Sequence, residues 1–139
     1  HLNKWNAYRR KFAQYYENIN NPEIEVPIAK PAPWCTEQVF HIFPILVGDS
    51  QVERQELMDY MQEQGSQVGI HYPICIEETG AYGDIGTKQH NPRTRQNADR
   101  LVSLPIHPFM SHEDCLKVVS ILNGWKSEKV EVAMATAEA

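Results

Sequence analysis

The sequence contains few cysteines, and none of them is paired at close spacing. Among its 139 residues, Cys35, Cys75 and Cys115 lie far apart in the chain. A zinc ribbon needs CxxC-like pairs, and a disulfide framework needs a denser set of cysteines. The sequence therefore supports neither a zinc ribbon nor a disulfide framework. Three distant cysteines favour a reducing compartment, so we predict a cytoplasmic protein.

Long apolar runs and an excess of basic residues are also missing. No stretch of about 18 apolar residues could span a bilayer, and the first residues do not resemble a signal peptide. Lys and Arg number 13 against 18 Asp and Glu, which gives a formal net charge of -5. Nucleic acids and anionic membranes bind clustered positive charge. The composition therefore argues against both as partners.

The residues that are present suffice for one folded domain. The apolar fraction is 42%, and domains of ~100–150 residues are common. The chain starts at His1 rather than methionine, and apolar residues recur at helical spacing from Leu2 onward. We therefore expect it to begin inside a helix, either of a processed protein or of a piece cut from a longer one.

The first third of the sequence predicts a helix, a long connection and a strand. Residues 2–19 form an amphipathic pattern that the "NNP" at 20–22 would end. Residues 22–36 carry four prolines, too many for a helix or a central strand. Residues 38–47, "QVFHIFPILV", are rich in β-branched and aromatic residues and predict a strand, with an edge or a bulge at Pro44.

The remaining elements alternate between helices and strands. Ser50 with Glu53 is a capping-box signature for a helix ending near Gly65, and Ser111 with Asp114 is another for a last helix to Gly124. Strands are expected at 67–72 and 101–106, with a polar helix at 91–100 between them. This order predicts an α/β (α+β-like) fold with a small, mostly antiparallel sheet of about three strands covered by helices. We expect the domain to occupy residues 1–126, with 127–139 as frayed helix or disorder.

Several familiar catalytic or binding patterns are absent. The histidines show neither HxxxH nor HxxH spacing, so scattered histidines are a simpler interpretation than a metal site. Ser103, His107 and Asp114 could form a triad on paper, but no nucleophile-elbow glycines surround the serine. The glycines at 80, 83 and 86 lack a following Lys-Ser or Lys-Thr helix and more simply serve turns with positive φ.

The segment "GIHYPICIEETGAYGD" at 69–84 is the best candidate for a site. His71 and Tyr72 stand at the end of a predicted strand, where α/β folds place ligand contacts, and both can bind phosphate or sugar oxygens. The equally weighted alternative is that Tyr72 packs in the core and His71 is merely exposed. Glu77 and Glu78 would point to opposite faces of a strand, so a solvated surface is favoured over an acid-base pair.

Five blocks in order resemble the C-terminal small domain of the DegT-type nucleotide-sugar aminotransferases, fold-type I enzymes that use pyridoxal phosphate. They are "LNKWNAYRRKFAQYY" from 2, "VFHIFPILV" from 39, "GIHYP" from 69, "GAY" from 80 and "LVSLPIHPFMSHEDCLKVV" from 101. The resemblance extends to about Trp125. It implies a homodimeric parent that transfers an amino group from an amino acid such as glutamate to a keto-sugar on a nucleoside diphosphate.

The resemblance also implies which parts of the site this chain carries. The family's Schiff-base lysine and most cofactor contacts lie in a large domain that precedes this segment. No lysine here has the context of the cofactor lysine, so we expect no catalytic residue, no bound pyridoxal phosphate and no activity from this chain alone. The substrate-side candidates are His71, Tyr72, Glu77 and Tyr82.

The sequence departs from the family at two places near these candidates. Where the family often has His-Leu-Gln after "HYP", this chain has Glu77-Glu78-Thr79, and Arg95 stands where an acid is common. Carboxylates repel phosphate but accept hydrogen bonds from sugar hydroxyls or an amine. The sugar preference therefore does not carry over.

Two other interpretations remain open. One is a stand-alone binding or dimerisation module derived from this fold, without catalysis. The other is a small independent enzyme that uses His71 with Glu77 or Asp84, which would require an enclosed pocket. The aminotransferase interpretation predicts instead that the apolar face of the 2–19 helix is partly exposed.

Overall fold

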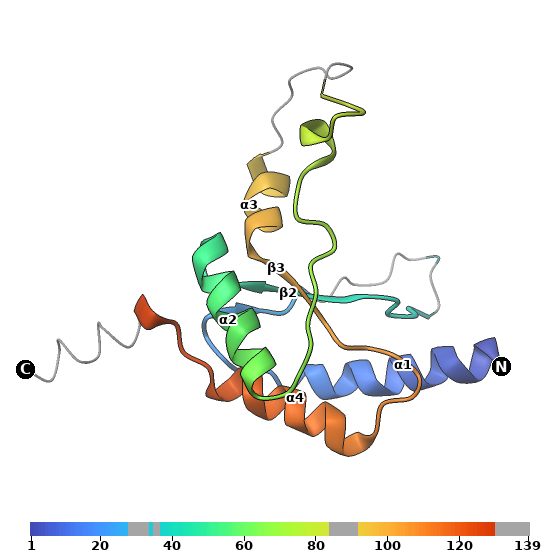
Figure 1. Ribbon diagram of the computed structural model, residues 1–139. Coiled ribbons are helices and arrows are strands. Elements are labelled where there is room, and N and C mark those ends of the chain that lie inside the picture. Colours follow the sequence, from blue (N-terminus) through green and yellow to red (C-terminus); the bar gives the residue numbers. More distant parts are fainter. Residues whose placement is uncertain (28–33, 35–36, 84–91, 130–139) are drawn as a thin grey trace, which may run out of the picture.

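The computed structural model describes residues 1–27, 34, 37–83 and 92–129, and these form one α/β unit (Figure 1). In chain order the elements are α1 (Leu2–Tyr16), β1 (Ile24–Glu25), β2 (Phe43–Val47), α2 (Gln51–Glu63), the short 3-10 helix η1 (Ile76–Glu78), α3 (Pro92–Arg100), β3 (Leu101–Leu104) and α4 (His112–Gly124). None of the helices in these described ranges is long and apolar enough to cross a membrane.

The sheet is antiparallel, with the strand order β1-β2-β3. Its centre is β2, which pairs Phe43 with Leu104 and Ile45 with Val102 on one side. On the other side β1 pairs only with the last two residues of β2. Pro44 therefore lies where β2 has a partner on one side only, which is the edge-like environment expected for a residue without an N–H. The predicted fold class is confirmed.

One hydrophobic core joins the sheet to three helices. It contains Tyr16 from α1, Ile45 from β2, Leu57 and Met61 from α2 and Leu122 from α4, all of them fully buried. In Figure 1, α1 and α4 lie side by side beneath the sheet, while α3 and the segment before η1 extend away from them. The core thus lies between the sheet and α1, α2 and α4, and α3 extends from it while still packing against α2 and β2.

Several predicted boundaries were wrong. The first helix ends at Tyr16 rather than Ile19, and the strand expected over 38–47 begins only at Phe43. Instead of a strand over 67–72, only a single bridge forms, between Gly69 and Ser103. After α1, the Asn21 amide donates to the Leu122 and Trp125 carbonyls. Before β2, Phe40 has positive φ, and Arg9 binds the Phe40 and His41 carbonyls. These contacts join segments that are distant in the sequence, so periodicity does not encode them.

Two further expectations near the candidate site were wrong. Glu77 and Glu78 lie in η1 rather than on a strand, so the argument from opposite strand faces does not apply. Glu78 instead accepts a hydrogen bond from the backbone N–H of Cys75 at 3.2 Å and forms an ion pair with Arg95 of α3. Gly80 and Gly83 do not have positive φ, in contrast to Gly48 and Gly65; Gly86 lies outside the described residues.

The predicted N-caps are confirmed at both helices, but the full capping box only at α4. At the start of α2, the Ser50 hydroxyl accepts from the Glu53 N–H, while the Glu53 carboxylate accepts from the Asp49 N–H. Ser111 and Asp114 form a reciprocal capping box at the start of α4, with bonds of 3.0 and 2.8 Å. These bonds satisfy backbone donors that have no partner within the helix.

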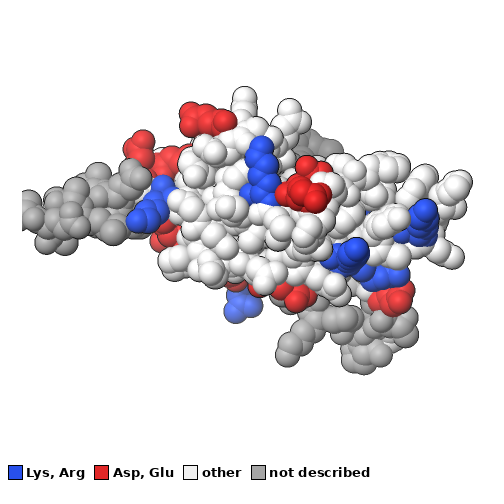
Figure 2. Space-filling model, turned by 90° about the horizontal axis from the view of Figure 1, so that it is seen from below, with Lys and Arg blue, Asp and Glu red and all other residues white. Residues whose placement is uncertain are grey.

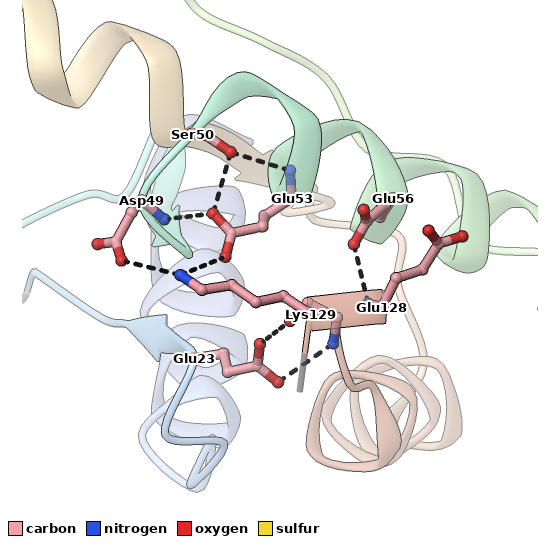
Figure 3. Close-up of polar contacts among 8 residues, drawn as sticks. Glu23, Asp49, Ser50, Glu53, Glu56, Glu128 and Lys129 are labelled. Atoms are coloured by element: carbon pink, nitrogen blue, oxygen red, sulfur yellow. Dashed lines mark hydrogen bonds and ion pairs between the residues drawn. The ribbon is translucent and has the colours of Figure 1, made fainter. Parts of the chain in front are cut away.

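Residues 127–129 pack against the domain. Ser127 is fully buried, and both its N–H and its hydroxyl donate to the carboxylate of Glu23. Lys129 extends between Asp49 and Glu53, with its Nζ 3.9 and 3.8 Å from their carboxylates (Figure 3). The start of the predicted tail is therefore tied to β1 and to the N-terminus of α2, and residues 130–139 lie outside the described part of the chain.

Candidate functional site

An open hollow lies where β3 meets the segment around Gly69, and we call it the His71 hollow. Its volume is about 350 Å³. The polar residues of its lining are His41, Gln67, His71, Tyr72 and Ser103. The other lining residues are Ile42, Val68, Gly69, Leu104, Pro105 and Ile106. The hollow thus combines hydrogen-bonding side chains with nonpolar ones, as ligand sites commonly do.

Three contacts to one serine hold the segment that carries His71. The Gly69 N–H donates to the Ser103 carbonyl at 3.1 Å, and the Ser103 N–H donates to the Gly69 carbonyl at 2.7 Å. The Ser103 hydroxyl also lies 3.0 Å from Nδ1 of His71. His71 is therefore fixed to β3 by backbone and side chain together.

Arg9 of α1 fixes the opposite wall. Its Nη1 donates to the backbone carbonyls of His41 at 3.1 Å and Ile106 at 2.6 Å, and more weakly to that of Phe40 at 3.4 Å. One guanidinium group thus links two segments that are distant in sequence and that both line the hollow. The sequence analysis did not identify Arg9 or the role of His41, because neither lies in a local motif and only the fold brings them to this place.

The predicted substrate-side residues divide into two pairs. His71 and Tyr72 both line the hollow, and their rings meet edge to face at 6.0 Å. Tyr72 is 74% exposed, so it stands at the mouth and does not pack in the core. Glu77 on η1 and Tyr82 in the following turn are exposed and do not line the hollow. Asp84 lies outside the described residues.

The serine triad considered from the sequence does not assemble. Ser103 contacts His71 and not His107. Asp114 is occupied in the capping box of α4, and Nδ1 of His107 accepts from the Phe109 N–H at 3.3 Å. Within the described ranges, no three His, Cys, Asp or Glu side chains come together as a candidate metal site. The arrangement therefore favours binding through neutral donors and acceptors.

The groups with displaced pKa values serve the core and the helix ends. Burial, together with the nearby Asp114 carboxylate, raises the pKa of the Cys115 thiol to about 11. Burial likewise raises the pKa of Tyr16, whose hydroxyl donates to the Pro105 carbonyl. A thiol that remains protonated at neutral pH is a poor nucleophile, so Cys115 acts as a packing residue.

Surface charge does not form a basic stripe on the face that carries α1 and α4. Figure 2 shows a largely uncharged surface there, with basic and acidic side chains interspersed. Such a face lacks the concentrated positive field that attracts nucleic acid.

Comparisons with known proteins converge on one family. The model of the DegT/DnrJ/EryC1/StrS aminotransferase family matches residues 1–123. A dTDP-3-amino-3,6-dideoxy-alpha-D-galactopyranose transaminase from Aneurinibacillus thermoaerophilus is 36% identical over 124 residues, which are 88% of this chain and 32% of the relative. A dTDP-3-amino-3,4,6-trideoxy-alpha-D-glucose transaminase from Streptomyces venezuelae is 29% identical over 136 residues, which are 96% of this chain and 34% of the relative.

Solved structures agree with this result. The crystal structure of S. venezuelae DesV in complex with a ketimine intermediate matches 90% of this chain and 33% of its own, with a TM-score of 0.77 and 27% identity. A DegT DnrJ EryC1 StrS aminotransferase from Brucella abortus has the same fold at a TM-score of 0.71 and 22% identity, covering 86% of this chain and 31% of its own. The chain spans about a third of the length of these relatives.

Proposed function

The chain belongs to the DegT/DnrJ/EryC1/StrS aminotransferase family, and from this premise we propose that it is the small C-terminal domain of a pyridoxal phosphate-dependent aminotransferase. The proposed substrate is a keto-sugar linked to a nucleoside diphosphate, and the proposed donor is an amino acid such as glutamate. Two relatives named as dTDP-amino-sugar transaminases support this substrate class. The observation that carries the proposal is the His71 hollow, because it presents sugar-binding chemistry on the segment that the family resemblance singled out.

The chemistry of the hollow suits a sugar nucleotide. Imidazole, phenol, amide and hydroxyl groups can each donate to or accept from sugar hydroxyls and phosphate oxygens. Among the described residues, no carboxylate lines the hollow. We therefore assign substrate binding to His71 and Tyr72 first, and we keep Glu77 and Tyr82, which lie outside the lining, only as further candidates.

We also propose that the described residues do not form a pyridoxal phosphate site by themselves. This cofactor provides the electron sink of the reaction and is held by a lysine. The described lysines are all exposed, and none lines the His71 hollow: Lys4, Lys11, Lys117, Lys126 and Lys129. No chemical step through the cofactor is derived from these side chains, and we propose that the chain is inactive by itself.

We further propose that the N-terminal half of α1 packs against the cofactor-binding domain of the same enzyme. Leu2, Trp5 and Tyr8 are 66%, 40% and 37% exposed, although the same face becomes buried at Phe12. The rings of Trp5 and the exposed Phe109 also pack edge to face, with their centroids 6.1 Å apart. An apolar surface of this kind marks a contact with another protein surface, and two thirds of the length of the relatives is available to supply it.

A stand-alone binding module is the second candidate function. It is favoured by the hydrophobic core, which joins the sheet to α1, α2 and α4 within the described residues. Such a module would bind a sugar nucleotide in the His71 hollow without any cofactor.

The test uses the 139-residue chain and a longer polypeptide that contains it after a cofactor-binding domain. We expect the 139-residue chain to bind dTDP-linked sugar weakly, to lack the absorbance of bound pyridoxal phosphate and to show no transamination. We expect the longer polypeptide to bind the cofactor and transfer an amino group, and we expect His71→Gln to raise its KM by roughly tenfold for the loss of one hydrogen bond to the substrate. A longer polypeptide that neither binds the cofactor nor transaminates would overturn the aminotransferase proposal and leave the binding module.

A further inference from the structure

We propose that Ser103 is the positioning residue for His71, holding Nδ1 of the imidazole so that Nε2 is the nitrogen left for the substrate. The inference rests on the proposed function, since it assigns the device that orients a substrate-binding side chain. Three observations about the hydroxyl of Ser103 carry it.

The first observation is the position of Ser103 in β3. Side chains alternate between the two faces of a strand, and the neighbours Val102 and Leu104 belong to the hydrophobic core. Ser103 therefore points to the other face, where it lines the His71 hollow. Its side chain is directed at the site and away from the core.

The second observation is that Ser103 is buried, with only 5% of its surface exposed. A buried hydroxyl without a partner costs about 1–3 kcal/mol, and alanine or valine would avoid that cost in a strand. The partner present here is Nδ1 of His71 at 3.0 Å. The bond to the imidazole thus accounts for a polar residue between two core residues.

The third observation is that the backbone beside His71 is held in place, although the His71 side chain itself is exposed. The two backbone bonds between Gly69 and Ser103 fix the chain two residues before the imidazole. The ring lies beside Gly69, where a Cβ would be in ordinary van der Waals contact with Cε1 of His71 at 3.4 Å. The Ser103 hydroxyl then selects the orientation of the His71 ring, because it bonds to Nδ1 and cannot bond to Nε2 at the same time.

The bond between the Ser103 hydroxyl and Nδ1 of His71 should affect how tightly the substrate binds. A ring fixed in the free protein loses less side-chain freedom when the ligand arrives, and this preorganisation increases affinity. The bond at Nδ1 also biases the tautomer, which decides whether Nε2 donates or accepts. Ser103 would therefore change substrate affinity without touching the substrate.

The matched variants are Ser103→Thr and Ser103→Val in the 139-residue chain. Threonine and valine have nearly the same shape and both suit a strand, but only threonine keeps the hydroxyl. The first measurement is the ¹⁵N chemical shifts of the His71 ring, which report the tautomer populations without any ligand. The second is the Kd for dTDP-glucose as the probe, measured by NMR titration of the wild type and each variant.

We expect Ser103→Thr to keep the wild-type tautomer populations and affinity. Ser103→Val should shift the tautomer populations and weaken binding of the probe about 3- to 10-fold, as for the loss of one neutral hydrogen bond. In the background of His71→Gln, the same valine substitution should have no further effect on Kd, because the two residues act as one unit. Ser103→Ala gives a second test should the valine variant fold poorly.

Two results would overturn the inference. One is an unchanged tautomer distribution in Ser103→Val or Ser103→Ala. The other is an equal effect from Ser66→Ala, which removes another buried hydroxyl outside the His71 hollow and serves as the matched control. Absence of probe binding by the wild type would count against the proposed function instead, and the ring shifts would still decide the role of Ser103.

Discussion

At the scale of single residues, Gly48 shows how one missing side chain permits the start of α2. Its φ is +49°, in the region that glycine adopts most readily. A Cβ there would lie only 2.6 to 2.7 Å from three atoms of the Glu53 side chain. Glu53 cannot move away freely, because its carboxylate accepts from the Asp49 N–H and the Ser50 hydroxyl at 2.8 and 3.0 Å.

Gly48→Ala should therefore destabilise the domain by about 2–4 kcal/mol, from the backbone conformation and the steric clash together. The measurement is the free energy of unfolding in urea. Gly80→Ala is the control, since a Cβ there would meet no heavy atom within 4 Å, and it should change stability by less than about 0.5 kcal/mol. Equal effects of the two substitutions would show that the contact with Glu53 does not matter.

At the scale of an element, the N-terminus of α2 is stabilised by a buried carboxylate. Hydrogen bonding from the Asp49 backbone, followed by that from Ser50 and the charge of Lys129, lowers the pKa of Glu53 despite the opposing effect of burial. Figure 3 shows the carboxylate surrounded by these groups. A pKa that is lower in the folded state than in the unfolded state means that the ionised form is bound more favourably in the folded protein.

The contribution of Glu53 should therefore be complete above its unfolded pKa of about 4.3 and should vanish as the pH falls through the lower folded pKa. We expect Glu53→Gln to reduce the free energy of unfolding by about 1–2 kcal/mol at pH 7. The difference from wild type should shrink below about pH 4. Urea titrations across this pH range measure it, with exposed Glu63→Gln at the other end of α2 as the control. A difference independent of pH would refute the role of the charge.

At the scale of the whole molecule, the two halves of α1 differ: one half is buried in the domain and the other is exposed. Its C-terminal half packs in the core through Phe12, Ala13 and Tyr16. Its N-terminal half leaves Leu2 and Trp5 exposed, which agrees with the exposure that the aminotransferase interpretation predicted. The same helix therefore belongs to the domain at one end and offers a contact surface at the other.

Substitutions along this face should separate the two purposes. Leu2→Ser with Trp5→Ser should change the stability of the 139-residue chain by less than about 1 kcal/mol, because these side chains are partly solvated. Phe12→Ala on the same helix should cost about 3–5 kcal/mol. Sedimentation of the folded chain should show concentration-dependent association that the double variant reduces. A strongly destabilised double variant would mean that the exposed half of α1 belongs to the core.

Local patterns predicted the elements that depend on neighbours in sequence. The caps at Ser50 and Ser111 were found because the bonding partners lie three residues away. The bond of Asn21 to the Leu122 and Trp125 carbonyls, by contrast, spans more than 100 residues. Interactions of that kind leave no periodic trace, which explains why the helix end near Tyr16 and the short strand β1 were missed.

The sequence by itself determined the fold class and the helix N-caps, because these rest on residue type and local spacing, and it determined the family from blocks spread along the chain. Only the tertiary structure decided which side chains share the hollow: it brought Ser103 and His41 to His71, and it left Glu77 and Tyr82 outside the lining. The physical reason is that a site is defined by distances through space. Those distances follow from how the sheet pairs and how α1 and α4 pack, which no short stretch of sequence specifies.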